Sequence, residues 1–156
     1  MVVYNGYGLC NNTEFQEDSL SQVISEVSMP RFYNPESIRA PFSAYSHGVE
    51  VQPGARSIYF SGQVGCDSNG TVPSDFASQM RNVYANIEAI LIDGDMGYRD
   101  LAKVTSFMTR REDIEAARDI RRQILGDAHP AHTLLLVSGL ASTDFLIEVE
   151  GFACKD

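Results

Sequence analysis

The last part of the chain contains its longest apolar run, and the pattern there predicts two strands. Residues 133–137 are almost continuously aliphatic, as expected for a strand covered on both faces, and turn-forming residues follow at 138–144. From Phe145 to Phe152 the residues alternate, so Glu148 and Glu150 share one face of a second strand. Such an acidic pair is either an ordinary solvated sheet face or part of a site. The alternation alone favours the solvated face.

Two helices are predicted in the middle of the chain. Apolar residues recur at spacings of three and four from Phe76 to Leu91, directly after Ser74 and Asp75, either of which can cap the helix. A similar spacing runs from Ile114 to Leu125 and predicts a second amphipathic helix, with Arg121 among the charged residues outside its buried side. Both helices have an apolar side that must pack against another element.

The remaining strands complete the predicted fold. They lie at 45–51, 57–63 and 101–108, and the first two are expected to form a hairpin. Helices separated by strands imply an α+β fold, a two-layer sandwich in which both helices cover one face of a single sheet. The other face carries Glu148 beside apolar neighbours and needs a cover, which self-association would supply.

The N-terminal stretch differs from the rest of the chain. Residues 1–39 are polar and interrupted by Pro30 and Pro35, and only 19–27 have the spacing of a short amphipathic helix. We therefore predict an N-terminal extension at 1–39 and one folded domain at 40–156.

Composition and charge narrow the class of protein. Twelve Lys and Arg face 21 acidic residues, and the net charge of -9 disfavours a protein that binds phosphate backbones. The three cysteines have neither metal-ligand nor paired spacing, which fits reduced thiols in a cytoplasmic protein. No apolar run approaches the length of a membrane span. We expect a cytoplasmic protein with no nucleic-acid or membrane partner, and with no metal or cofactor.

Four short motifs then occur in the order of a known family. They are AYSHGV at 44–49, IYFSGQ at 58–63, PAHT at 130–133 and IEVEGFA at 147–153. Together with Gln79 and the helix around it, they make the stretch from about residue 42 to 154 similar to the reactive intermediate deaminase family, RidA/YjgF.

This resemblance implies a chorismate-mutase-like fold in a homotrimer, whose three sheets form a central barrel with a pocket at each subunit interface. Active members of the family hydrolyse enamine and imine intermediates to a keto acid and ammonia. By position, the family pocket corresponds to Tyr45, Ser61, Gly62, His132 and Glu148. In the family the residue at the position of Glu148 handles the water.

The chain departs from the family at the substrate clamp. His132 stands where active members carry an arginine that grips the substrate carboxylate, and a neutral imidazole offers only one donor. Arg118 stands where an asparagine is usual, and Leu134 where a small residue is common. Two interpretations stay open. Either Arg118 or a protonated His132 holds an anion, or the pocket no longer binds a carboxylate.

Two functions therefore remain open from the sequence. The first is a divergent enamine or imine hydrolase in which Glu148 positions water. The alternative is a non-catalytic trimer that binds a small metabolite or regulates through the same pocket. A metal site made of His129, His132 and Glu148 lacks the usual ligand spacing. An older label in the family, an RNA-cleaving translation inhibitor, fits the acidic balance poorly.

Overall fold

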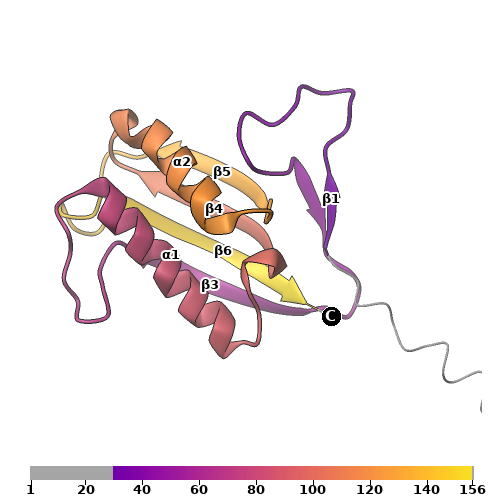
Figure 1. Ribbon diagram of the computed structural model, residues 1–156, viewed down its shortest axis with the longest axis horizontal. Coiled ribbons are helices and arrows are strands. Elements are labelled where there is room, and N and C mark those ends of the chain that lie inside the picture. The colour runs from indigo at the N-terminus through magenta and orange to yellow at the C-terminus, as the bar shows by residue number, and fades with distance from the viewer. Residues whose placement is uncertain (1–29, 156) are drawn as a thin grey trace, which may run out of the picture.

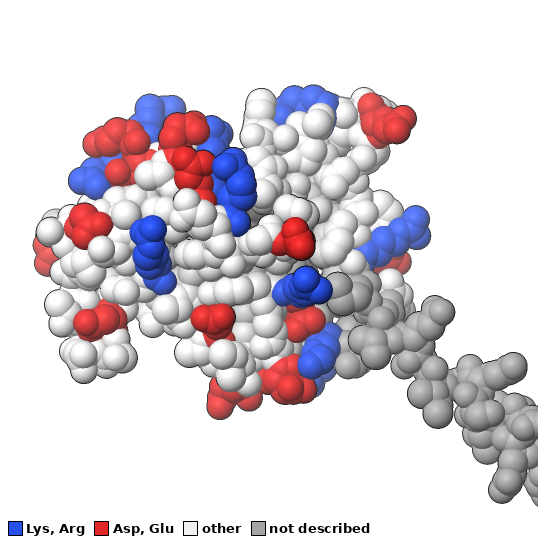
Figure 2. Space-filling view, viewed as in Figure 1, with Lys and Arg blue, Asp and Glu red and all other residues white. Residues whose placement is uncertain are grey.

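The computed structural model describes residues 30–155 of the 156-residue chain (Figure 1). The helix predicted at 19–27 lies outside the described residues. Within the described part, no helix is both long enough and apolar enough to cross a bilayer. In the view of Figure 2, acidic and basic side chains are interspersed over this surface.

A four-stranded sheet forms the centre of the fold. Its strands lie in the order β3-β6-β4-β5, with bounds Arg56–Val64, Ile147–Lys155, Leu101–Met108 and Ala131–Leu136. β6 pairs antiparallel with both β3 and β4, whereas β4 and β5 are parallel. β3 and β5 are therefore the two edges of the sheet.

Both helices cover the same face of this sheet, as Figure 1 shows. α1 spans Phe76–Asp93, and its first turn is capped by the Asp75 carboxylate, which accepts a hydrogen bond from the Ser78 amide at 2.8 Å. α2 spans Ile114–Leu125, and single turns of 3-10 helix, η3 and η4, precede β4 and α2. The bounds of the 3-10 turns are Tyr98–Asp100 and Arg111–Asp113. The predicted two-layer α+β sandwich is confirmed.

The predicted hairpin at 45–63 is wrong. The first of its strands is short, β2 at Gly48–Glu50, and it pairs with β1 at Arg31–Tyr33 in a separate two-stranded sheet. β3 instead aligns along β6, which offers it a partner of equal length. The strand β1 lies in the segment that we assigned to the N-terminal extension. Its pairing with β2 therefore crosses the domain boundary that we predicted at residue 40, and this boundary stays a prediction.

The two faces of the sheet differ in how they are covered. On β6, Ile147, Val149 and Ala153 point toward the helices and are fully buried. The opposite face, which we call the open face, carries Glu148, Glu150 and Phe152 from the same strand. Its other side chains include Tyr59, which is 77 % exposed and stacks on Phe152, and Thr133 and Leu135 of β5. The prediction that 133–137 is covered on both faces is therefore wrong for the single chain.

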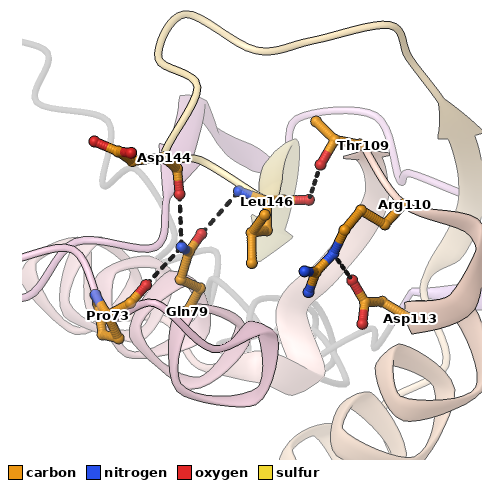
Figure 3. A network of polar contacts seen from close by, with 7 residues as sticks. All are labelled: Pro73, Gln79, Thr109, Arg110, Asp113, Asp144 and Leu146. Atoms are coloured by element: carbon orange, nitrogen blue, oxygen red, sulfur yellow. Dashed lines mark hydrogen bonds and ion pairs between the residues drawn. The ribbon is translucent and has the colours of Figure 1, made fainter.

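A buried amide joins α1 to the loop before β6 (Figure 3). The Gln79 Nε2 atom donates to the carbonyls of Pro73 and Asp144 at 2.7 and 2.8 Å, and its Oε1 atom accepts from the Leu146 amide at 2.9 Å. Gln79 has no exposed surface. These contacts fix the start of β6, and with it the register that assigns Glu148 to the open face.

Candidate functional site

A cavity of about 240 Å³ lies on the covered face, between α2 and strands β4 and β5. Four of the residues predicted for the site line it together: Tyr45, Arg118, His132 and Leu134. Most of the remaining wall is apolar and comes from both helices and from β4 and β6. The apolar residues are Phe42, Met80, Met108, Ile114, Ala117, Leu134 and Ile147, and the polar ones are Ser43, Tyr45, Ser106, Arg118, Arg121 and His132.

Arg121 on α2 lies in the cavity wall and is only 4 % exposed. Our placement of Arg121 outside the buried side of the helix is therefore wrong. It lies four residues after Ala117 and four before Leu125, both buried, and so occupies a core position of the amphipathic stripe. Burial lowers the pKa of the Arg121 guanidinium, but an arginine at this position still carries its charge.

The acceptors around Arg121 are all neutral. Its Nη2 atom donates to Ser43 Oγ at 3.1 Å and to the Ala44 carbonyl at 3.5 Å, and Nη1 donates to Nδ1 of His132. Its Nε atom is buried without a hydrogen-bond partner among residues 30–155, and no carboxylate pairs with Arg121 in that part of the chain. The cavity wall thus contains a buried cation that no anion within residues 30–155 balances.

His132 is a neutral acceptor in this arrangement. Because a guanidinium can only donate, Nδ1 of His132 must accept from Arg121, so the ring proton lies on Nε2 and is donated to Ser106 Oγ at 3.0 Å. Burial, and then the nearby charges of Arg121 and Lys103, lower the pKa of His132 to about 3. A protonated His132 is therefore not available to hold an anion near neutral pH.

Arg118 differs from Arg121 although both line the cavity. Its Nη1 atom forms an ion pair with Glu115 at 2.5 Å, and its side chain is partly exposed. A carboxylate one turn away on the same helix thus already balances the charge of Arg118. Of the two arginines, Arg121 is the one that forms no ion pair in the described part of the chain.

Tyr45 closes the end of the cavity next to His132. The two rings have centroids 6.4 Å apart, and the Tyr45 hydroxyl accepts a hydrogen bond from the Phe42 amide at 3.3 Å. The next residue, Ser46, forms an isolated bridge with Ala131 at the start of β5. The segment before β2 is therefore tied to the strand that carries His132.

Glu148 does not line this cavity. It pairs in register with Phe107, whose neighbours along β4, Ser106 and Met108, are buried under the helices. Because side chains alternate along a strand, Glu148 projects from the open face, opposite to His132. Within one chain, the predicted site is therefore divided between the two faces of the sheet.

Ser61 and Gly62 lie beside Glu148, at a bulge in β3. Two residues of β3, Ser61 and Gly62, stand between the paired positions Phe60 and Gln63, where β6 has only one. A Cβ atom on Gly62 would lie 1.8 Å from Oε1 of Glu148, so only glycine lets the carboxylate rest against this backbone. The bulge thus defines where the Glu148 carboxylate lies.

The described residues offer no obvious metal site. Within 30–155, no group of three His, Cys, Asp or Glu side chains is arranged to hold a metal ion.

Comparison with known proteins places this geometry in a family. The sequence profile of the family described as endoribonuclease L-PSP matches residues 36–155. The chain belongs to this family, RidA/YjgF. A RutC family protein of Pyrococcus abyssi is 29 % identical over 123 residues, which cover 78 % of this chain and 94 % of that one. TdcF of Escherichia coli, named as a candidate reactive intermediate deaminase, is 26 % identical over 126 residues, 77 % of this chain and 95 % of TdcF.

Solved structures of the RidA/YjgF family share the fold. A Rid family protein of Yersinia pestis, YyfB, superposes with a TM-score of 0.72 at 26 % identity, and the match covers 81 % of this chain and 99 % of that one. A crystal structure of Escherichia coli TdcF with bound serine gives a TM-score of 0.61 at 23 % identity, covering 81 % and 99 %. The second likeness extends to the fold alone.

Proposed function

We propose that this RidA/YjgF protein is a homotrimeric hydrolase of small enamines or imines, in which Glu148 activates the attacking water. The observation that carries the proposal is the position of Glu148, which lies against Gly62 at a strand bulge, on a partly apolar sheet face that a single chain leaves uncovered. The relationship to TdcF supports the same class of reaction.

The open face supports the trimer. Tyr59, Leu135 and Phe152 present apolar surface there, and each Å² left in water costs about 25 cal/mol. Three sheets that close around a threefold axis would bury this surface and remove the free edges of β3 and β5. Because Glu148 and the cavity lie on opposite faces of one sheet, a site that uses both has to combine two subunits.

The chemistry asked of Glu148 is general base and then general acid catalysis. The carboxylate takes a proton from water as the oxygen adds to the imine carbon, and it passes that proton to the nitrogen to give a carbinolamine. It then takes the hydroxyl proton of the carbinolamine and passes it to the nitrogen as the C–N bond breaks, so that ammonia leaves and the carbonyl forms. One water is consumed, and a carbonyl compound and ammonia are formed, with no change of oxidation state. Neither a metal nor a redox cofactor is needed for this step.

A second candidate function is a non-catalytic trimer that binds a metabolite. The neutral His132 favours it, because the strand position at which active family members carry the clamping arginine offers no charge here. RNA cleavage, the activity in the family's description, is not proposed, because 21 acidic residues against 12 basic ones disfavour binding to a phosphate backbone.

The decisive experiment adds the full-length protein to a serine or threonine dehydratase reaction and follows the release of keto acid. We expect faster release than in buffer, and a roughly 100- to 10,000-fold loss of this acceleration in Glu148→Gln. Glu150→Gln removes a more exposed carboxylate from the same face of β6 and is the matched control. If keto acid is released at the buffer rate for every imine offered, and the protein still binds a ligand, the hydrolase proposal fails and the non-catalytic binding protein is favoured.

A further inference from the structure

The unpaired charge of Arg121 is unusual for a protein interior. Moving a charged group out of water is costly unless a partner of opposite charge or a full set of hydrogen bonds compensates. Arg121 is 4 % exposed, has only neutral acceptors, and keeps a buried Nε atom without a partner among residues 30–155. A local cost of this kind is typical of a functional position.

We propose that Arg121 is the anion-binding residue of this protein, and that the cavity takes a small organic carboxylate whose aliphatic part packs on Met80, Met108 and Leu134. This inference rests on the proposed function for the identity of the pocket, and it names the residue that would hold the charged end of the ligand. The positive charge that the family resemblance assigns to the strand is then supplied here from helix α2, by a guanidinium that contacts His132 at that strand position.

The contacts of Arg121 suit this role. Nδ1 of His132 and Oγ of Ser43 hold the two terminal nitrogens of the guanidinium, which fixes the plane of the group before a ligand arrives. A carboxylate is the anion that matches the planar, forked donors of a guanidinium. In this arrangement His132 acts as an acceptor that orients the cation.

The cavity sets the size and character of the ligand. A volume of about 240 Å³ has room for a small organic molecule, and an apolar wall favours an aliphatic chain over a second charged group. The positive charge is local, because the chain as a whole carries a net charge of -9. An anion is therefore attracted by Arg121 itself and not by the surface of the chain as a whole.

The competing explanation is that Arg121 only props up the segment at Ser43 and Ala44. The two roles differ in their effect on stability. A structural prop lowers the melting temperature when it is removed, whereas replacing an unbalanced buried charge by an apolar side chain of similar size leaves it equal or raises it. Arg121→Met therefore separates the two explanations.

The test measures binding of 2-oxobutanoate to the full-length protein by isothermal titration calorimetry, with uncharged butanone as the second probe. We expect Arg121→Met to weaken 2-oxobutanoate about 10- to 100-fold and to leave butanone unchanged. Arg122→Met is the matched control, because it removes the same charge from the next residue of α2, where the side chain is exposed and paired with Asp119. Arg122→Met should change the affinity for 2-oxobutanoate less than about threefold, because salt screens the charge of an exposed side chain.

Arg121→Gln is made in parallel, and near-ultraviolet circular dichroism shows which variant is folded. Equal affinity of the wild type and either folded variant for 2-oxobutanoate overturns the proposal, as does an equal loss in Arg122→Met. Because binding is measured without turnover, the result is independent of the hydrolase. If 2-oxobutanoate binding depends on Arg121 but no imine is hydrolysed, the role of Arg121 stands and the proposed hydrolase fails. If imines are hydrolysed but Arg121→Met binds 2-oxobutanoate as the wild type does, only the role of Arg121 is overturned.

Discussion

The covered and the open face of the sheet are made by the same strands, yet they are completed in different ways. The covered face closes within one chain, where α1 and α2 bury Ile147 and Val149 fully. The open face leaves Tyr59 and Phe152 stacked on each other at the surface. One charged residue lies in an unusual setting on each side of the sheet: Arg121, which α2 buries against the covered face, and Glu148, which lies against the bulge on the open face.

This difference separates the requirements of folding from those of function. The covered face supplies the core, so a change there tests the stability of a single subunit. The open face contributes little to the core of one chain, so a change there tests association. The two unusual charges lie on opposite faces, which means that a site using both depends on folding and on association together.

The largest effect is expected from a charge placed on the open face. Tyr59→Glu should convert the proposed trimer of about three times 17.2 kDa into folded monomers and should abolish the proposed imine hydrolysis, because burying an unpaired carboxylate between subunits is costly. Sedimentation equilibrium at micromolar concentration measures the mass. Ile92→Glu, which places the same charge on the exposed side of α1, is the control and should stay trimeric. A wild-type protein that sediments as a folded monomer would contradict the comparison of the faces.

The next effect concerns pH and the covered face. His132 has a folded-state pKa of about 3 against an ordinary value of 6.5, so below pH 6.5 the unfolded chain takes up a proton that the folded chain does not. The free energy of unfolding should therefore fall as the pH is lowered, by up to about 1.4 kcal/mol per pH unit from this residue.

Urea denaturation between pH 5 and 7 measures this slope. His132→Asn should flatten it, whereas His129→Asn changes an exposed histidine outside the cavity and serves as the control. An unchanged slope in His132→Asn would mean that His132 is not buried as a neutral ring.

The smallest effect is expected at the bulge. A Cβ atom on Gly62 would overlap Oε1 of Glu148, so Gly62→Ala should displace the carboxylate and lower kcat/KM for imines about tenfold, with little change in melting temperature. Gly139→Ala adds a Cβ atom with nothing within 4 Å and is the matched control. Full activity of Gly62→Ala would show that the position of Glu148 against β3 is not needed.

Periodicity predicted most of the fold because the covered face obeys simple rules. The predicted helix at 76–91 and strand at 101–108 correspond to α1 and β4, since their apolar residues face one continuous core. The hairpin failed because strand pairing depends on partners far away in the chain. Residues 45–63 contain no pattern that distinguishes β1 from β3 as the partner of β2.

The candidate site was harder to predict than the fold. Family motifs brought Tyr45, His132 and Leu134 together, and all three line one cavity. Arg121 was missed because charged residues on an amphipathic helix are usually solvated, although its spacing from Ala117 and Leu125 was visible. That Glu148 faces away from His132 follows from strand pairing, which the sequence alone does not specify.

The buried amide of Gln79 has a consequence for how the protein opens. Its three hydrogen bonds join α1 to residues 65 and 67 positions later in the chain and to the Pro73 carbonyl, so the loop before β6 cannot detach alone without leaving these groups unpaired in the core. The Leu146 amide should then exchange its proton with solvent only when the whole domain unfolds. The loop before β6 should therefore belong to the part of the domain whose amide protons exchange most slowly. The amides of β6, the strand that carries Glu148, should be protected from exchange to the same degree.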